Sequence, residues 1–111
     1  MTLDIKETGL KLTPSLLEYI EKRFLPLNRF VKRYEEKREL HVFLEVAQTT
    51  RHHRKGNVFY IEAMVELPKK LVRAEVNDAN LRSAVNKIKD KLKKELVSYK
   101  ETHNWRLERG G

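Results

Sequence analysis

One long amphipathic segment, from Asp78 to about Lys100, places the strongest constraint on how this chain folds. Its apolar residues recur in steps of three and four, so they share one face of a helix. These residues are Leu81, Val85, Ile88, Leu92, Leu96 and Tyr99. A helix of this length extends about 33 Å at ~1.5 Å per residue. Such a stripe has to pack on another layer of the structure, because a domain is stable only when these apolar faces are buried.

Lysine and arginine residues flank this apolar stripe on both sides. At about 100° per residue, one flank carries Arg82, Lys89, Lys93 and Lys100, and the other carries Lys87, Lys91 and Lys94. Asp90 and Glu101 fall opposite the stripe. Packing of the stripe on a core therefore turns two rows of cations toward solvent, where they attract phosphate groups.

The overall composition indicates a basic, single-domain protein. The chain has 111 residues, a formal net charge of +8 and 36% charged residues, which favours a polyanionic partner such as nucleic acid. It has no cysteine, which excludes disulfides, thiol catalysis and cysteine-ligated zinc. No signal peptide is visible, and no apolar run approaches the ~20 residues of a membrane span. We therefore expect a soluble cytoplasmic protein without membrane contact.

The rest of the sequence predicts four strands and a second helix. Alternating residues predict strands at about residues 3–8, 40–47, 59–67 and 71–76. Thr13-Pro14 starts a helix, and Pro26 should kink it or split off a short second piece. The predicted fold is α+β, in the order β-α-β-β-β-α. A right-handed crossover makes the first two strands parallel, so the four-stranded sheet is mixed, with both helices on one face as in double-stranded-RNA-binding domains.

The boundaries of the last helix define the domain limits. We expect Asn77-Asp78 to cap its start and His103-Asn104-Trp105 to end it. The prediction is one domain over residues 1–103, followed by a flexible tail over residues 104–111.

Two surfaces could bind a partner. The open sheet face should carry Phe43 and Tyr60, but four glutamates on that face would repel a stacked RNA strand. The helical side is basic, so we expect it to bind structured RNA by shape and backbone charge. The candidate RNA-binding residues are Arg23, Arg29, Arg82, Lys87, Lys89, Lys91 and Lys94. An ordinary solvated basic surface is the alternative.

An enzymatic function is not indicated. The adjacent His52 and His53 point apart and make a poor chelate, and the other histidines lack metal-ligand spacing. None of the four glycines opens a helix, so there is no glycine-rich phosphate loop. We expect no catalysis, no cofactor, no metal and no small-molecule substrate.

Several segments resemble the bacterial ribosome hibernation-promoting factor family. This family includes the ribosome-associated inhibitor, and its members were once described as sigma-factor modulation proteins. The matching segments are Thr13-Pro14 with the helix after it, Arg51 to Phe59 with Glu62-Ala63, Leu67-Pro68 to Glu75, and the helix from Ala84 to Leu96. Their order and spacing cover about residues 1–100.

The resemblance implies binding to the small ribosomal subunit, in the channel for messenger and transfer RNA near the decoding centre. Occupying it would block translation in resting or stressed cells. By position, Arg23, Lys91 and Lys94 would contact the 16S ribosomal RNA, whereas Ser98 replaces a frequent basic residue. Ribosome dimers and inactive single ribosomes are both open outcomes, and the chain is either a short form or the amino-terminal part of a longer protein. We expect a monomer away from the ribosome.

Two alternatives stay open at this point. One is a general structured-RNA-binding domain. The other is a protein–protein regulatory module that acts on transcription and uses the sheet face, where Phe43, Tyr60 and Met64 lie.

Overall fold

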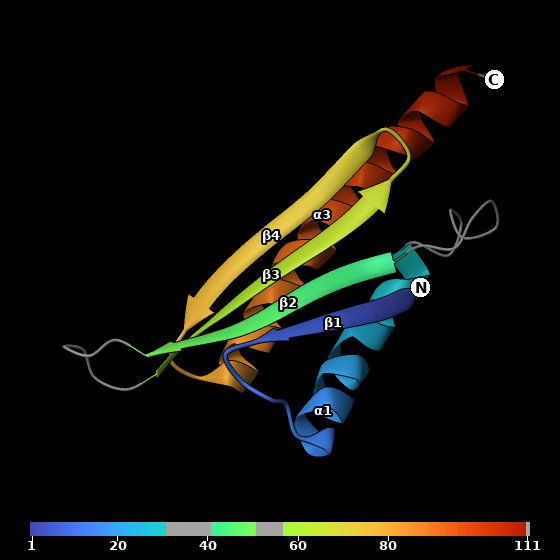
Figure 1. The fold of residues 1–111 in the computed structure, drawn as a ribbon. Coiled ribbons are helices and arrows are strands. Elements are labelled where there is room, and N and C mark those ends of the chain that lie inside the picture. The colour runs from blue at the N-terminus through green and yellow to red at the C-terminus, as the bar shows by residue number, and fades with distance from the viewer. Residues whose placement is uncertain (31–40, 51–56, 111) are drawn as a thin grey trace.

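The computed structural model describes residues 1–30, 41–50 and 57–110 (Figure 1). The elements are β1 (Thr2–Thr8), α1 (Pro14–Phe24), the 3-10 helix η1 (Leu25–Leu27), β2 (His41–Thr50), β3 (Asn57–Leu67), β4 (Lys70–Asp78) and α3 (Leu81–Gly110). The predicted order of strands and helices is therefore confirmed. His52 and His53, from which no metal site was expected, lie outside the described residues.

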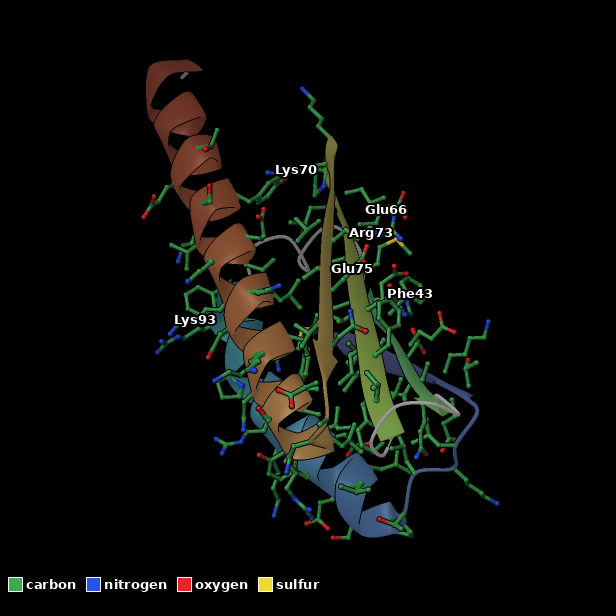
Figure 2. The ribbon with its side chains drawn as sticks, turned by 90° about the vertical axis from the view of Figure 1, so that its left-hand side faces the viewer. Phe43, Glu66, Lys70, Arg73, Glu75 and Lys93 are labelled. Carbon is green, nitrogen blue, oxygen red and sulfur yellow. The ribbon has the colours of Figure 1, made fainter. Side chains whose placement is uncertain are left out.

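The four strands form one mixed sheet in the order β1-β2-β3-β4. β1 runs parallel to β2, and β2, β3 and β4 form an antiparallel meander. Figure 2 shows the sheet nearly edge-on, with α1 and α3 on one side and Phe43 and Glu66 on the other. The predicted α+β architecture, with both helices on one face, is thus confirmed.

The core lies between the sheet and the two helices. All six residues of the predicted α3 stripe are buried, from Leu81 to Tyr99. The same core contains alternate residues of the three meander strands: Val42, Leu44 and Val46, then Ile61, Ala63 and Val65, then Val72, Ala74 and Val76. Ile20 and Phe24 of α1 complete this layer. Full burial of one such side chain contributes roughly 1.5–3 kcal/mol.

The two ends of α1 follow from its sequence. Thr13 Oγ1 accepts a hydrogen bond from the Leu16 amide at 3.1 Å, and Pro14 occupies the first turn. Pro26 lacks the backbone N–H that donates a hydrogen bond in an α-helix, so α1 stops at Phe24 and the chain continues as η1. The predicted split at Pro26 is confirmed.

Gly9 lets the chain leave the edge strand β1. Its φ of +73° is a left-handed conformation that side chains disfavour. A Cβ at this position would lie 2.6 Å from the carbonyl oxygen of Gln48 in β2. Only glycine therefore allows this close approach between the two parallel strands.

The predicted ends of the long helix are wrong. Asn77 and Asp78 belong to β4, and the N-cap is Asn80, whose Oδ1 accepts a hydrogen bond from the Ser83 amide at 2.9 Å. The backbone of α3 continues past residues 103–105 to Gly110 and projects beyond the β3–β4 turn (Figure 1). No glycine or proline occurs between Tyr99 and Arg109 to stop it. The division into a domain over residues 1–103 and a flexible tail over 104–111 stays a prediction.

The central position of Leu92 makes it a test of this core. Leu92 is 0% exposed, so Leu92→Ala leaves a cavity under α3. The free energy of unfolding should fall by roughly 2–5 kcal/mol in urea denaturation. The exposed Glu95, in the same helix, gives the control Glu95→Ala, which should cost under about 0.5 kcal/mol. Equal effects of the two substitutions would contradict the assigned core.

Candidate nucleic-acid interface

Tyr19 of α1 lies at the contact between the two helices. Asn86 Nδ2 in α3 donates a hydrogen bond to the Tyr19 hydroxyl at 3.0 Å. The guanidinium carbons of Arg23 and Arg82 lie over the Tyr19 ring, 5.4 and 5.3 Å from its centroid. Cation–π attraction thus brings together an arginine of α1 and an arginine of α3.

The hydroxyl of Tyr19 is polarised by its neighbours. Hydrogen bonding to Arg23 lowers the pKa of the hydroxyl, the hydrogen bond from Asn86 acts in the same direction, and burial opposes both. Tyr19 is not among the candidate residues predicted from the sequence. Its spacing of four residues from Arg23 was a visible signal, but its contact with Arg82 depends on the packing of the helices.

A second aromatic ring extends this basic region along the helices. The guanidinium carbon of Arg29 lies 4.9 Å from the centroid of the Phe30 ring, and Lys93 Nζ of α3 lies 5.9 Å from it. Together with the contacts at Tyr19, these cations form a group on the side of α3 that faces α1. We call Arg23, Arg29, Arg82, Lys89 and Lys93 the interhelical cluster.

The other predicted row lies along the edge of the sheet. Lys91 Nζ donates to the Glu75 carbonyl at 2.9 Å, and Lys87 Nζ lies 2.8 Å from Asp78 Oδ2. A surface hollow of about 540 Å³ lies at this edge and is lined by Glu75, Val76, Asn77, Lys87, Asp90, Lys91 and Lys94. We call Lys87, Lys91 and Lys94 the β4-side row.

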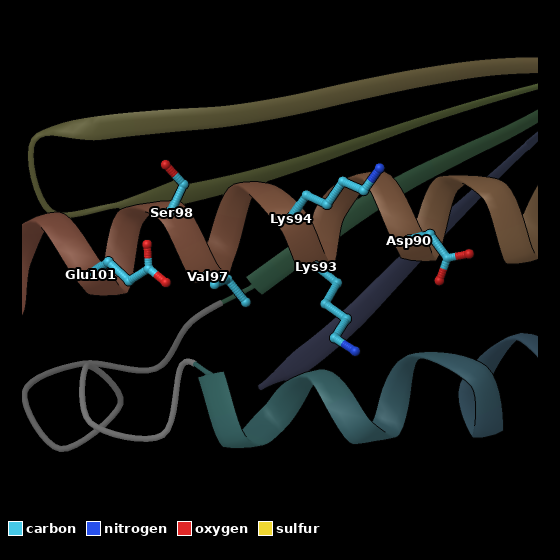
Figure 3. A pocket seen from close by; sticks show the side chains of 6 residues that line it. All are labelled: Asp90, Lys93, Lys94, Val97, Ser98 and Glu101. Atoms are coloured by element: carbon cyan, nitrogen blue, oxygen red, sulfur yellow. The ribbon is translucent and has the colours of Figure 1, made fainter.

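The structure therefore divides the seven predicted residues between two sides of α3. Arg23, Arg29, Arg82 and Lys89 belong to the interhelical cluster, and Lys87, Lys91 and Lys94 form the β4-side row. Figure 3 shows the divergence at two successive residues: Lys93 points toward α1, and Lys94 points away from it.

The outer surface of α3 between these two sides is electrically balanced. A hollow of about 490 Å³ is lined there by Asp90, Lys93, Lys94, Val97, Ser98 and Glu101 (Figure 3). Its two lysines face two carboxylates, so the hollow has no excess charge for a phosphate group. The positive potential of α3 comes from its flanks.

Not every predicted cation is equally available to a partner. Lys87 is bound to Asp78, and Lys89 Nζ lies 3.1 Å from Asp90 Oδ1. Within residues 1–30, 41–50 and 57–110, Arg23, Arg82, Lys91 and Lys94 form no ion pair with a carboxylate. Nearby acids therefore neutralise part of the charge at two of the seven predicted positions.

Asp78 holds the junction between β4 and α3. Its Oδ1 accepts the Asn80 amide at 2.9 Å, and its Oδ2 accepts the Ser83 hydroxyl at 2.7 Å and Lys87 Nζ at 2.8 Å. The hydrogen bond from Lys87, followed by those from Asn80 and Ser83, holds the pKa of this carboxyl well below its usual range. Asp78 thus fixes both the start of α3 and one lysine of the β4-side row.

The open sheet face has the opposite electrostatic character. Glu45 lies opposite Glu62, and Glu62 lies opposite Glu75. Arg73 pairs with Glu62 at 2.5 Å and with Glu75 at 3.8 Å, which relieves part of this repulsion. Burial and the hydrogen bond to Glu62 raise the pKa of Tyr60 to about 12. The predicted glutamates and Tyr60 therefore do occupy one face, away from the basic helices.

Two further features of the described residues concern metals and membranes. Among residues 1–30, 41–50 and 57–110, no group of three or more His, Cys, Asp or Glu side chains could hold a metal ion. None of the helices in that part of the chain has the length and apolar composition for crossing a membrane.

The fold and charge distribution define a small α+β domain with a basic helical layer on one face of a mixed sheet. The chain belongs to the Sigma 54 modulation protein / S30EA ribosomal protein family, whose model matches residues 3–104. The family resemblance noted in the sequence is thereby confirmed, and membership indicates a ribosome-associated function.

Solved structures of two other proteins share the fold. The amino-terminal domain of Protein Y from Thermus thermophilus is 24% identical with a TM-score of 0.71, and the match covers 89% of this chain and 99% of that chain. A ribosomal subunit interface protein from Coxiella burnetii is 19% identical with a TM-score of 0.72, over 91% of this chain and 99% of that chain. A comparison with curated protein sequences gives no match.

The low pKa of Asp78 predicts a pH-dependent contribution to stability. A carboxyl whose pKa is lower in the folded state stabilises the fold above its unfolded pKa of about 3.9, and this contribution disappears as the pH falls further. Asp78→Asn should therefore lower the urea midpoint at pH 7, and the difference from the parent protein should narrow below about pH 4.

The matched control is Asp90→Asn, because Asp90 is an exposed carboxylate of α3 whose one ion pair within the described residues is with Lys89, at 3.1 Å. Its effect on the midpoint should be small. A constant difference between the parent protein and Asp78→Asn from pH 7 to pH 2.5 would contradict the role assigned to Asp78.

Proposed function

We propose that this protein is a ribosome hibernation factor. It binds the small ribosomal subunit in the channel for messenger and transfer RNA, near the decoding centre. While bound, it blocks translation in resting or stressed cells. The single observation that carries the proposal is the basic helical layer of a chain that belongs to a ribosome-associated family. The similar fold of a protein described as a ribosomal subunit interface protein supports the same location.

The proposed mechanism is steric and electrostatic and involves no bond making. Cations on both flanks of α3 neutralise phosphates of the 16S ribosomal RNA and release counterions, so the affinity depends steeply on salt. The sheet behind the helices fills the channel and excludes messenger and transfer RNA. The glutamates of the open sheet face would repel an RNA backbone, which favours docking through the helices.

The contacts that we propose come from both sides of α3. By position in the family, Arg23, Lys91 and Lys94 contact the ribosomal RNA, and the charge of the two helices adds Arg29, Arg82, Lys87 and Lys89. Arg23, Arg29, Arg82, Lys91 and Lys94 are the strongest candidates, because no carboxylate among the described residues forms an ion pair with them. This role requires neither a cofactor nor a small-molecule substrate, and it places a monomeric protein in the cytoplasm.

One observation favours a protein–protein role as a second candidate. Phe43 on the open sheet face is 47% exposed, beside a hollow of about 270 Å³ that includes Met64. A regulatory partner that docks there would depend on Phe43 and be indifferent to Lys91 and Lys94. Phe43→Ser, tested beside the lysine variants, separates the two functions.

Removal of two lysine charges tests the proposed ribosome contact. Lys91→Gln together with Lys94→Gln should weaken binding to purified small subunits by tenfold or more and reduce the slope of log K against log salt by about two, if each lysine neutralises one phosphate. Sedimentation at a series of salt concentrations measures both quantities. The free energy of unfolding should change by under about 0.5 kcal/mol per exposed substitution.

The single variant Lys94→Gln has a matched control in Lys6→Gln. Lys6 lies on the exposed side of β1, beside Glu45 of the open sheet face, so this change removes one positive charge away from the helices. Its binding should remain within about twofold of the parent protein. Equal losses from Lys6→Gln and Lys94→Gln would mean that net charge, rather than the helical surface, controls binding.

Mapping the protected ribosomal RNA tests the location. Protection of nucleotides that line the channel near the decoding centre is the expected result. Protection elsewhere would rule out the proposed mechanism. Equally tight binding to a simple RNA duplex and to small subunits, measured by competition, would instead favour a general structured-RNA-binding domain.

A further inference from the structure

We infer that Tyr19 is a positioning residue that holds Arg23 and Arg82 together as a two-guanidinium site for one phosphodiester group of RNA. The inference deepens the proposed function, on which it rests. It assigns a specific role to a residue without formal charge and links the two helices in the recognition of one phosphate.

Arg23 and Arg82 contact the same aromatic ring. Arg23 and Arg82 come from different helices, yet their guanidinium carbons lie 5.4 and 5.3 Å from the centroid of the same Tyr19 ring. Two positive groups repel one another when they are close in space. Their common attraction to one phenol ring offsets that repulsion and keeps both charges beside the same side chain.

A guanidinium group that contacts an aromatic ring can still donate hydrogen bonds from its edge. Its contact with the aromatic face uses the flat surface of the group and leaves N–H donors at its edge. Phosphate oxygens accept hydrogen bonds from such edges, often in pairs. Arg23 and Arg82 are both exposed, and neither forms an ion pair with a carboxylate within the described ranges. The Tyr19 hydroxyl uses part of the Arg23 donor set, and the remaining guanidinium N–H groups of both residues are available to a phosphate group from outside.

Contacts with both helices fix the position of the Tyr19 ring. Asn86 Nδ2 binds the Tyr19 hydroxyl at 3.0 Å, and both residues are half-buried at the contact between α1 and α3. The ring is thus anchored to both helices, and its position follows from the packing of the core. A positioned arginine loses less rotamer freedom when it binds, so the ring should increase the affinity for phosphate.

Binding to small subunits forms the first arm of the test. Tyr19→Leu removes the ring and should weaken binding roughly 5- to 30-fold, because two arginines that are no longer positioned lose more rotamer freedom on binding. Tyr19→Phe keeps the ring and should lose less than about threefold, the value of a modest hydrogen bond.

A double-mutant comparison distinguishes positioning from a general structural role. In the background of Arg23→Gln with Arg82→Gln, Tyr19→Leu should weaken binding by no more than about twofold, because the ring acts through the two arginines. An unchanged 5- to 30-fold loss in that background would overturn the inference. So would binding of Tyr19→Leu that equals the parent protein. If Tyr19→Leu fails to fold in a thermal melt, Asn86→Ala takes its place in the same cycle.

The second arm uses inorganic phosphate and needs no ribosome. The arginine Nε–Hε signals of Arg23 and Arg82 should shift together in NMR spectra of the parent protein and of Tyr19→Phe as phosphate is added. In Tyr19→Leu the shifts should be smaller and unequal. Phosphate-induced shifts of the two arginine signals that depend on the aromatic ring, in a protein that fails to bind small subunits, would refute the proposed function. They would leave the phosphate site in place. Ribosome binding that does not depend on the ring, with signals that do not respond to phosphate, would refute the site and keep the function.

Discussion

Burial of the α3 stripe against β3 and β4 is the interaction on which the rest of the structure depends. It fixes the rotation of a 30-residue helix about its own axis, and every charged residue on that helix takes its direction from this rotation. Both ends of the stripe are secured by polar contacts. Asn80 caps the first turn, and the Tyr99 hydroxyl donates a hydrogen bond to the Pro68 carbonyl at 2.8 Å, at the β3–β4 turn. A buried Tyr99 therefore contributes to the core without leaving its hydroxyl unsatisfied.

The same packing separates positive from negative surface. The two flanks of the stripe place one group of cations against α1 and another along β4, while the sheet keeps the glutamates on its far side. A polyanion that approaches the helices meets cations on both sides of α3. The balanced hollow at Asp90 and Glu101 lies between them, so the expected contact consists of two lines of phosphates rather than one continuous patch.

Much of this arrangement could be predicted from the sequence, because each strand alternates and the α3 stripe keeps the helical period. Three features could not. Asp78 and Asn80 are both capping residues, and only the turn between them decides which one caps α3. The apolar periodicity is lost after Tyr99, but the backbone of α3 nevertheless continues to Gly110. The pairing of Lys87 with Asp78, and of Tyr19 with Arg82, joins residues that only tertiary packing brings together.

The close approach at Gly9 has a consequence far from its own position. Among residues 1–30, 41–50 and 57–110, β1 is an edge strand that pairs with β2 alone, so this parallel pairing holds the amino-terminal strand in the sheet. Any side chain at Gly9 would push against the Gln48 carbonyl and loosen that pairing. The chain from Gly9 leads directly into α1, which carries Tyr19 and Arg23. Gly9, which has neither charge nor side chain, thus helps to determine how the basic residues of α1 are placed relative to those of α3.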